Sequence, residues 1–152
     1  MEVIYEMKME ADERKKQIRQ AAMKVFLDKG FRNTVMNDIM EATGLSRGGL
    51  YHHYGSTYEI LYDIMVEGNL NRKDIIQKSI NDEGLILSPH LFSRMIIDKI
   101  LADNDYAKLY IMFLCELKEN DDLKELYVKI KKESIQVFKE LFYSLFKELP
   151  SD

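Results

Sequence analysis

Two short helical segments on either side of a glycine turn constrain the fold of this chain more than any other feature. Thr34 is predicted to cap the first segment, because its side-chain oxygen can accept a bond from a free amide of the first turn. Thr43-Gly44-Leu45 forms a tight turn, since Gly44 can take a left-handed conformation. Ser46 is predicted to cap the second segment, and Gly55 to end it. Each helix is therefore only about two turns long.

A longer helix is predicted before this pair. Apolar residues recur there at positions i, i+3, i+4, i+7 and i+8, which gives one buried face before Gly30 ends the helix. Those residues are Ile18, Ala21, Ala22, Val25 and Phe26. A long helix followed by two short helices around a glycine turn is the geometry of a helix-turn-helix. In such units the second short helix enters the major groove of DNA, so a DNA-binding function is predicted.

The composition of the second short helix favours the same function. Gly48 and Gly49 lie inside it, and each costs about 1 kcal/mol of helix stability relative to alanine. A helix that is pressed against a duplex gains from the missing side chains. Arg47 can reach guanine O6 and N7 or a phosphate. Hydroxyl and imidazole donors for phosphate contacts follow at Tyr51, His52 and His53.

Charge is unevenly distributed along the chain. Residues 14–58 carry eight Lys and Arg against three Asp and Glu, a net charge of +5. Since the whole chain carries −4, the remainder carries −9. A basic block beside an acidic body favours a polyanion as the partner of the N-terminal part. On charge alone, the alternative that these residues merely solvate helix faces is equally compatible.

The remaining sequence predicts four further helices and no strand. Ser56 and Glu59 form a capping box that opens the first of them. Ser88-Pro89 is an N-cap followed by proline at the first helical position. The predicted ranges are 57–80, 88–102, 106–117 and 122–148. The fold class is therefore all-α, with a three-helix helix-turn-helix domain at residues 1–60 and a helical regulatory domain at residues 85–152. The helix that opens after Ser56 runs on from the first domain to about residue 80.

Residues 18–61 closely resemble the N-terminal DNA-binding domain of the tetracycline-repressor (TetR) family of bacterial transcriptional regulators. The resemblance covers under a third of the chain, but its order and spacing are specific. It is carried by Ile18, Ala21-Ala22, Phe26, Lys29-Gly30-Phe31, Thr34, Asp38-Ile39, Ala42-Thr43-Gly44-Leu45-Ser46, Gly48, Leu50-Tyr51-His52-His53-Tyr54, Ser56, Glu59 and Leu61.

This resemblance implies a ligand-responsive repressor that binds double-stranded DNA at a palindromic operator as a homodimer. It also implies that the C-terminal helical domain binds a small molecule and forms the dimer. The residues that match base-reading or phosphate-binding positions of the family are Thr34, Ser46, Arg47, Gly48, Gly49, Tyr51, His52 and His53.

Two positions depart from the family pattern. Thr57 stands where the family often has a lysine that touches phosphate, so one backbone contact is lost or is supplied by residues 14–19. Met40 stands where a small alanine is usual, so the packing between the two short helices is expected to differ slightly.

A set of apolar and aromatic residues in the C-terminal half can line a pocket for a small apolar or amphipathic effector. For any single one of these residues, packing of an ordinary core is the favoured explanation, whereas for the set as a whole the resemblance favours a pocket. The set is Met65, Phe92, Met95, Tyr106, Tyr110 and Phe113.

Catalytic and metal sites are not predicted. His52 and His53 are adjacent on a helix and point about 100° apart, so they cannot share one ion without other ligands. Asp121-Asp122 lies at a helix start, where capping explains it. The single cysteine, Cys115, excludes an internal disulfide and is predicted to be a buried, inert thiol. We therefore expect no enzyme, no cofactor and no metal.

A membrane location is not predicted either. The longest apolar run, residues 109–115, is far too short to span a bilayer. The chain does not open on a charged-then-apolar secretory leader, so a cytoplasmic protein is expected.

The last predicted helix has a broad apolar stripe, formed by Leu126, Ile130, Val137, Phe138, Leu141, Phe142, Leu145, Phe146 and Leu149. TetR-family proteins generally continue past such a helix with two more helices that form the dimer interface. The present sequence ends at Asp152, so it is either shortened or dimerises through surfaces that remain. A homodimer is predicted. The alternative is a regulator-like interaction protein that heterodimerises with a full-length relative and modulates it.

Overall fold

The computed structural model describes residues 2–83, 97, 101 and 103–146. These residues contain six α-helices, two 3-10 turns and no strand, so the expected all-α fold class is confirmed. The elements are α1 (Glu2–Lys29), η1 (Phe31–Asn33), α2 (Met36–Thr43), α3 (Arg47–His53), α4 (Thr57–Glu83), α6 (Asp105–Glu116), η2 (Leu117–Glu119) and α7 (Asp121–Phe146). The helix predicted for residues 88–102 lies outside the described residues.

Two glycines end helices where the sequence predicted breaks. Gly30 follows α1 with φ 81°, and Gly44 follows α2 in the left-handed region at φ 69°. Only glycine takes these conformations without a steric penalty. The Gly44 amide also donates to the Met40 carbonyl at 2.9 Å and so satisfies the end of α2.

The start of α3 is as predicted, whereas the start of α2 is not. The Ser46 hydroxyl accepts a hydrogen bond from the Gly49 amide at 3.2 Å, which confirms Ser46 as the N-cap of α3. Thr34 does not cap α2. Its hydroxyl donates to the Gly30 carbonyl at 2.9 Å, because η1 draws Thr34 back toward the end of α1. Val35 precedes α2 instead, and its amide donates to the Asp38 carboxylate at 2.9 Å.

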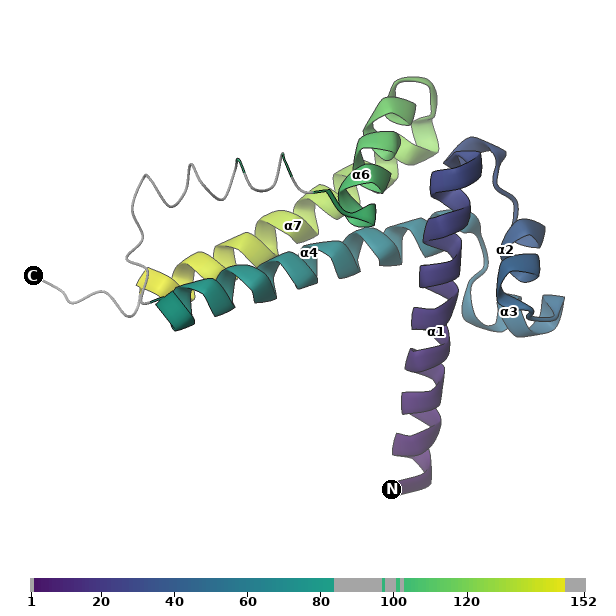
Figure 1. Ribbon diagram of the computed structural model, residues 1–152, viewed down its shortest axis with the longest axis horizontal. Coiled ribbons are helices and arrows are strands. Elements are labelled where there is room, and N and C mark those ends of the chain that lie inside the picture. Colours follow the sequence, from purple (N-terminus) through teal and green to yellow (C-terminus); the bar gives the residue numbers. More distant parts are fainter. Residues whose placement is uncertain (1, 84–96, 98–100, 102, 147–152) are drawn as a thin grey trace, which may run out of the picture.

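The helices form a small N-terminal unit and an elongated C-terminal layer that share α4 (Figure 1). α2 and α3 lie to one side of α1, and α1 crosses the beginning of α4. α4 and α7 lie side by side along most of their length, and α6 contacts both α1 and α4. The buried residues form one cluster that runs from Phe26 of α1 to Ile130 of α7. The domain boundary between residues 60 and 85 stays a prediction.

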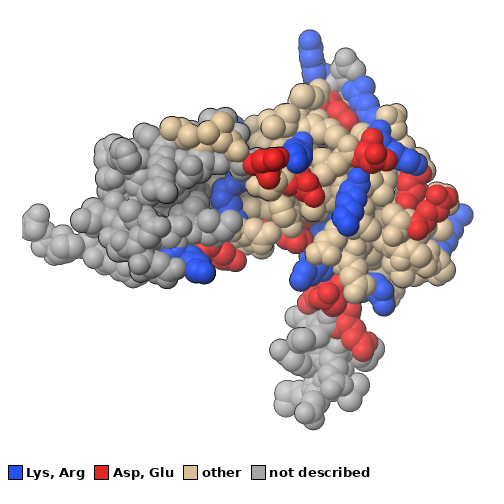
Figure 2. Space-filling view, viewed as in Figure 1, with Lys and Arg blue, Asp and Glu red and all other residues tan. Residues whose placement is uncertain are grey.

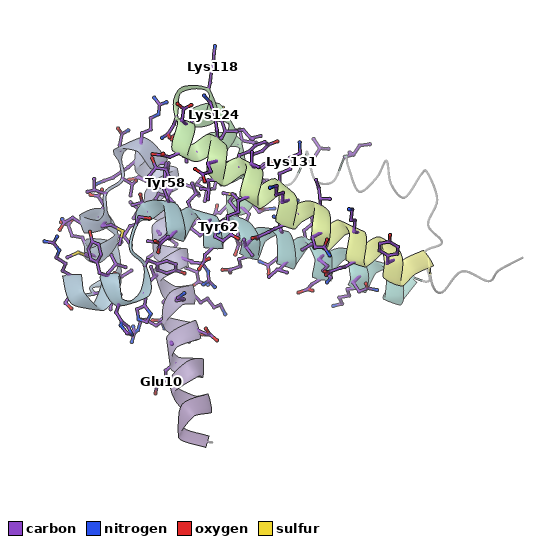
Figure 3. The ribbon with its side chains drawn as sticks, turned by 180° about the vertical axis from the view of Figure 1, so that it is seen from behind. Glu10, Tyr58, Tyr62, Lys118, Lys124 and Lys131 are labelled. Atoms are coloured by element: carbon purple, nitrogen blue, oxygen red, sulfur yellow. The ribbon has the colours of Figure 1, made fainter. Side chains whose placement is uncertain are left out.

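A ladder of polar contacts joins α4 to the segment from Asn120 through α7. Tyr58 and Tyr62 project from α4 on this side of the molecule (Figure 3). The Tyr62 hydroxyl donates to Glu133, and the Lys129 ammonium lies 3.8 Å from the centroid of the Tyr62 ring. Two further hydrogen bonds run from Asn120 to the Tyr58 hydroxyl at 3.1 Å and from Asn69 to the Ser134 hydroxyl at 2.6 Å. Lys73 and Glu140 form an ion pair at 3.6 Å.

The prediction that Cys115 is buried is wrong, because its side chain is exposed. α6 packs through one face only, on which Leu109 and Phe113 are each 1% exposed. An apolar run as long as residues 109–115 encircles the helix, so its outer members must face solvent. Ile111 and Leu114 share this outer position with Cys115.

No helix within the described ranges has both the length and the hydropathy that a bilayer-spanning segment needs.

Candidate nucleic-acid interface

α3 is fixed to the protein by one side and leaves the other side exposed. Leu50 of α3 and Ile39 of α2 are both fully buried, and they anchor the turn between the two helices. The exposed side of α3 comprises Arg47, Gly48, Tyr51 and His52. Positions i, i+1, i+4 and i+5 lie on one helix face, so these four residues form a continuous surface, here called the α3 face.

Arg47 begins the α3 face and has no carboxylate partner among the described residues. Its guanidinium carbon lies 5.6 Å from the centroid of the Tyr51 ring, which is 43% exposed. This cation–π contact steadies the side chain without using its N–H donors. The donors can therefore bind a base edge or a phosphate.

The two glycines of α3 differ in what surrounds them. A Cβ at Gly49 would lie 3.3 Å from the Ser46 Oγ and close to Leu45, so the N-cap itself favours glycine there. A Cβ at Gly48 would meet nothing within 4 Å. No contact within the described molecule requires glycine at position 48. A surface that approaches the α3 face from outside would explain it.

The basic stretch of α1 that contains Arg14 and Lys15 lies beside the end of α3. The rings of His52 and His53 are 5.1 Å apart, edge to face. Burial lowers the pKa of His53, and the positive charges of His52, Lys15 and Arg14 lower it further. Lys15 also lies 5.1 Å from the Tyr54 ring centroid. Arg14 and Lys15 therefore form a positively charged edge next to the α3 face, here called the cationic edge, and the two histidines lie beside them.

Arg19, by contrast, points away from the α3 face and forms an ion pair inside the protein. It pairs with Glu67 of α4, and its side chain is only 19% exposed. Of the segment 14–19 that could replace the missing family lysine, the structure brings Lys15 to the interface side and turns Arg19 away. Thr57, at the replaced position, is the half-buried first residue of α4.

The remaining predicted contact residues lie at helix starts and loops. Ser46 is exposed, and its hydroxyl still has a donor proton while the oxygen caps α3. Thr34 is 5% exposed and donates to Gly30, so its hydroxyl is engaged within the protein. A 2.6 Å ion pair between Lys29 and Asp38 ties the end of α1 to α2 nearby. The DNA-contact role of all eight predicted residues stays a prediction.

Met40 of α2 is partly buried and packs against the hydrophobic core. Its larger side chain occupies space at a position where the family usually has alanine.

Four of the six predicted pocket residues are described, and they belong to the core between α4, α6 and α7. Met65 is 6% and Phe113 1% exposed, whereas Tyr106 and Tyr110 are half-buried. Phe92 and Met95 lie outside the described residues. The effector-binding role of this set stays a prediction.

Charge on the face in Figure 2 is mixed, with Lys and Arg interspersed among Asp and Glu. On this face of the molecule, the charged residues form no broad basic patch. The local arrangement of the α3 face and the cationic edge carries the argument instead. Among the described residues, no group of His, Cys, Asp and Glu is placed to hold a metal ion.

Comparison with known proteins places the same region in a family. Residues 18–64 match the model of the family described as bacterial regulatory proteins, tetR family. YfiR of Bacillus subtilis, described as an uncharacterized HTH-type transcriptional regulator, is 44% identical over 57 residues. That match spans 38% of this chain and 28% of YfiR, so the chain matches less than a third of the relative's length.

Solved structures resemble the fold over a longer stretch. Salmonella enterica GusR superposes with a TM-score of 0.64 at 21% identity, covering 91% of this chain and 71% of GusR. AibR, solved in complex with isovaleryl coenzyme A and operator DNA, gives a TM-score of 0.54 at 22% identity. That superposition covers 91% of this chain and 77% of AibR. At these identities the likeness concerns the fold, and it agrees with an N-terminal helix-turn-helix followed by a helical domain.

Proposed function

Because the chain belongs to the TetR family of bacterial regulatory proteins, we propose that it is a DNA-binding transcriptional regulator whose α3 reads the operator. The observation that carries this proposal is the α3 face. Leu50 anchors the helix from inside, while Arg47, Gly48, Tyr51 and His52 are exposed together. A short, firmly anchored helix with donors on its outer side suits insertion into a major groove.

More specifically, we propose that the protein is a ligand-responsive repressor that binds a palindromic operator as a homodimer. Two copies of α3 would enter major grooves whose half-site centres are about 34–36 Å apart, or a multiple of that distance. The cationic edge of Arg14 and Lys15, with the two histidines beside it, would meet the phosphates. The complex of AibR with isovaleryl coenzyme A and operator DNA supports a small effector for a protein of this fold.

An enzymatic function is set aside because the family consists of DNA-binding regulators.

The test is fluorescence anisotropy with labelled duplex from the gene's own promoter region and with a scrambled duplex of the same length. We expect the promoter duplex to bind more tightly, with affinity falling steeply as salt rises, because phosphate contacts release counterions. The double variant Arg47→Ala, Tyr51→Ala should lose this binding. Lys124→Ala serves as the matched control, because Lys124 lies on α7, far from α3 (Figure 3).

Equal affinity of the two duplexes, or binding that does not depend on salt, would count against the proposal.

A second function is favoured by the outer side of α6 and α7. Ile111 is 59%, Val128 50% and Ile135 47% exposed, so apolar side chains are available to another protein. A regulator-like chain could use them to pair with a full-length relative and block it. The two functions differ in whether the purified protein alone protects a two-fold symmetric DNA site.

A further inference from the structure

Arg72 of α4 is a half-buried cation that has no carboxylate partner in the described part of the chain. Burial lowers the pKa of its guanidinium, and Tyr110 offsets this effect only in part. Arg19 shows what a paired arginine looks like in the same protein. Burial acts against its charge too, but the hydrogen bonds to Tyr54 and Glu67 outweigh burial and raise its pKa. The charge of Arg72 is therefore one that the described protein does not neutralise.

The packing of α6 on α4 brings Tyr110 to Arg72. A Cβ at Gly68 would lie 3.0 Å from the Tyr106 Cδ1, so the missing side chain lets the Tyr106 ring rest against α4. Arg72 lies one turn beyond Gly68 on α4, and Tyr110 lies one turn beyond Tyr106 on α6. The charges of Arg72 and Tyr110 are accordingly close enough to interact.

The hydroxyls of the two tyrosines differ in their partners. Tyr106 donates to the Glu67 carboxylate at 2.9 Å. The Tyr110 hydroxyl has no hydrogen-bond acceptor among the residues that the model describes. Burial, followed by Tyr127, raises the pKa of Tyr110, so its hydroxyl keeps its proton near neutral pH and is available as a donor. Two donors, the guanidinium and this hydroxyl, thus lie together without an acceptor.

An aromatic surface adjoins these two donors. The ring centroids of Tyr110 and Phe113 are 6.4 Å apart, and those of Phe113 and Tyr127 are 6.3 Å apart. Phe113 is buried, whereas both tyrosines are half-buried and can be reached from outside. The donors and the aromatic rings come from α4, α6 and α7, which contact one another and the intervening turn here (Figure 1). A charged end beside an apolar surface suits an amphipathic molecule.

The charge of Arg72 decides which kind of acceptor fits. A water molecule can accept hydrogen bonds from both donors, but it carries no charge to balance the guanidinium. A carboxylate or a phosphate accepts from both donors and balances the charge, and arginine binds either group through two parallel hydrogen bonds. The arrangement therefore favours an anion over a neutral or cationic molecule.

We propose that Arg72 and Tyr110 form the anion-binding part of the effector site, and that the effector is an organic anion with an apolar body. Arg72 forms the ion pair, Tyr110 donates the hydrogen bond, and the rings of Tyr110 and Tyr127 contact the apolar body. This inference rests on the proposed ligand-responsive function. It deepens that function by naming the chemical class of the effector.

The experiment measures thermal unfolding and calorimetric binding of the full chain with five probes at millimolar concentration. Three are anions: octanoate, octyl phosphate and 3-phenylpropanoate. Octylammonium and 1-octanol carry the same eight-carbon body with a positive or a neutral head. The proteins are wild type, Arg72→Met and Tyr110→Phe. Lys73→Met is the matched control, because it removes the same charge from the next residue of α4, whose ammonium pairs with Glu140 of α7.

At least one anion should bind wild type and raise its unfolding temperature, and it should bind more tightly than octylammonium and 1-octanol. Arg72→Met should weaken this binding about tenfold or more, because hydrogen bonds to a charged group are lost. Tyr110→Phe should weaken it about threefold, as the loss of one hydrogen bond from a neutral donor predicts. Lys73→Met should change it less than about twofold. The affinities for octanoate and octyl phosphate then show which head group is preferred.

The stability of the ligand-free proteins supplies a second readout. Arg72→Met keeps an unbranched side chain of similar length but removes an unpaired, partly desolvated charge. It should therefore unfold at the same temperature as wild type or at a higher one. A lower unfolding temperature would overturn the proposal, because the fold itself would then depend on the guanidinium.

The proposal is also overturned if none of the three anions binds wild type, or if an anion binds Arg72→Met as tightly as wild type. Equal or tighter binding of octylammonium or 1-octanol would overturn it as well. These measurements contain no DNA, so their failure refutes the anion site alone. Failure of the wild-type protein to bind its promoter duplex would instead refute the proposed DNA-binding function.

Discussion

Arg47 and Tyr51 form the part of the α3 face from which sequence-specific recognition can arise. The guanidinium lies over the Tyr51 ring, is exposed, and keeps its N–H donors available. Bidentate donation to guanine O6 and N7 is the commonest specific contact of arginine in the major groove. A phosphate contact would use the same donors without reading sequence.

The change Arg47→Ala distinguishes these two roles. If Arg47 reads a base, the variant should lose about 1–3 kcal/mol of binding free energy on the promoter duplex and much less on the scrambled duplex. The measurement is the ratio of the two affinities. A loss of equal size on both duplexes would assign Arg47 to a phosphate.

His53 is expected to make DNA binding depend on pH. Its pKa lies below the ordinary value of 6.5, chiefly through burial and then through His52, Lys15 and Arg14, so it is largely neutral at pH 7. A nearby phosphate favours the protonated form, so binding takes up a proton. We therefore expect affinity for the duplex to rise as pH falls below 7, and His53→Gln to reduce this rise. Affinity that is constant across this range would show that His53 does not face phosphate.

The same histidine affects folding in the opposite direction. Because the folded-state pKa is lowered, the unfolded chain binds more protons just below pH 6.5. The contribution of His53 to stability is therefore present above that pH and is lost as pH falls through the window down to its folded-state pKa. Tighter DNA binding at lower pH therefore does not come from a stabilisation of the fold by His53.

At the scale of the elements, α3 has a low intrinsic helix propensity and is held in place by its N-cap and by packing against the core. The seven-residue helix includes two glycines, but Ser46 caps it and Leu50 is fully buried. Gly48 is the informative position, because a Cβ there would meet nothing within 4 Å.

Gly48→Ala is expected to have opposite effects on folding and on binding. Alanine should stabilise α3, by up to about 1 kcal/mol, because it loses less backbone entropy than glycine. DNA affinity should nevertheless fall, because the added methyl group occupies the surface that approaches the duplex. Thermal unfolding and duplex binding of the same variant check both parts.

Gly44→Ala is the matched control for this change. Gly44 has φ 69°, so alanine there is strained although the space around it is open. This variant should lose stability. A Gly48→Ala protein that binds DNA as well as wild type would contradict the role of Gly48 at the interface.

The elements also show how far the sequence alone could lead. Helix boundaries marked by Gly30, Gly44 and Ser46 were predictable, because each depends on local backbone or capping chemistry. The hydrogen bond of Thr34 and the exposure of Cys115 were not predictable. The Thr34 hydroxyl bonds to Gly30 because of the unexpected η1 turn, and the exposure of Cys115 depends on which face of α6 meets α4 and α7. The hydrogen bonds that join Tyr106, Glu67, Arg19 and Tyr54 were equally inaccessible, because Arg19 and Tyr106 are 106 − 19 = 87 positions apart in the sequence.

At the scale of the whole molecule, one continuous buried cluster joins the helix-turn-helix to the helical body. α4 is the element that both parts share, since it contacts α1, α6 and α7. With such an arrangement we expect the position of α3 to depend on the packing of α6 and α7, which two separately folded units on a linker would not require.

Sedimentation tests the proposed dimer. Exposed apolar residues on α6 and α7, among them Ile111, Val128 and Ile135, provide a surface for association. At tens of micromolar, we expect a species of twice the chain mass of 17.9 kDa. Ile135→Lys should shift the protein toward the monomer. A wild-type protein that sediments as a monomer at this concentration would contradict the dimer.

Footprinting of the purified protein on its own promoter DNA tests the central claim most directly. A dimer that reads DNA through α3 should protect two half-sites related by two-fold symmetry, with centres about one helical turn or a multiple of it apart. The protection should weaken steeply as salt rises. It should disappear for the double variant Arg47→Ala, Tyr51→Ala and persist for Lys124→Ala. Absence of protection by the wild-type protein, or protection that the double variant retains, would contradict the assignment of α3 as the recognition helix.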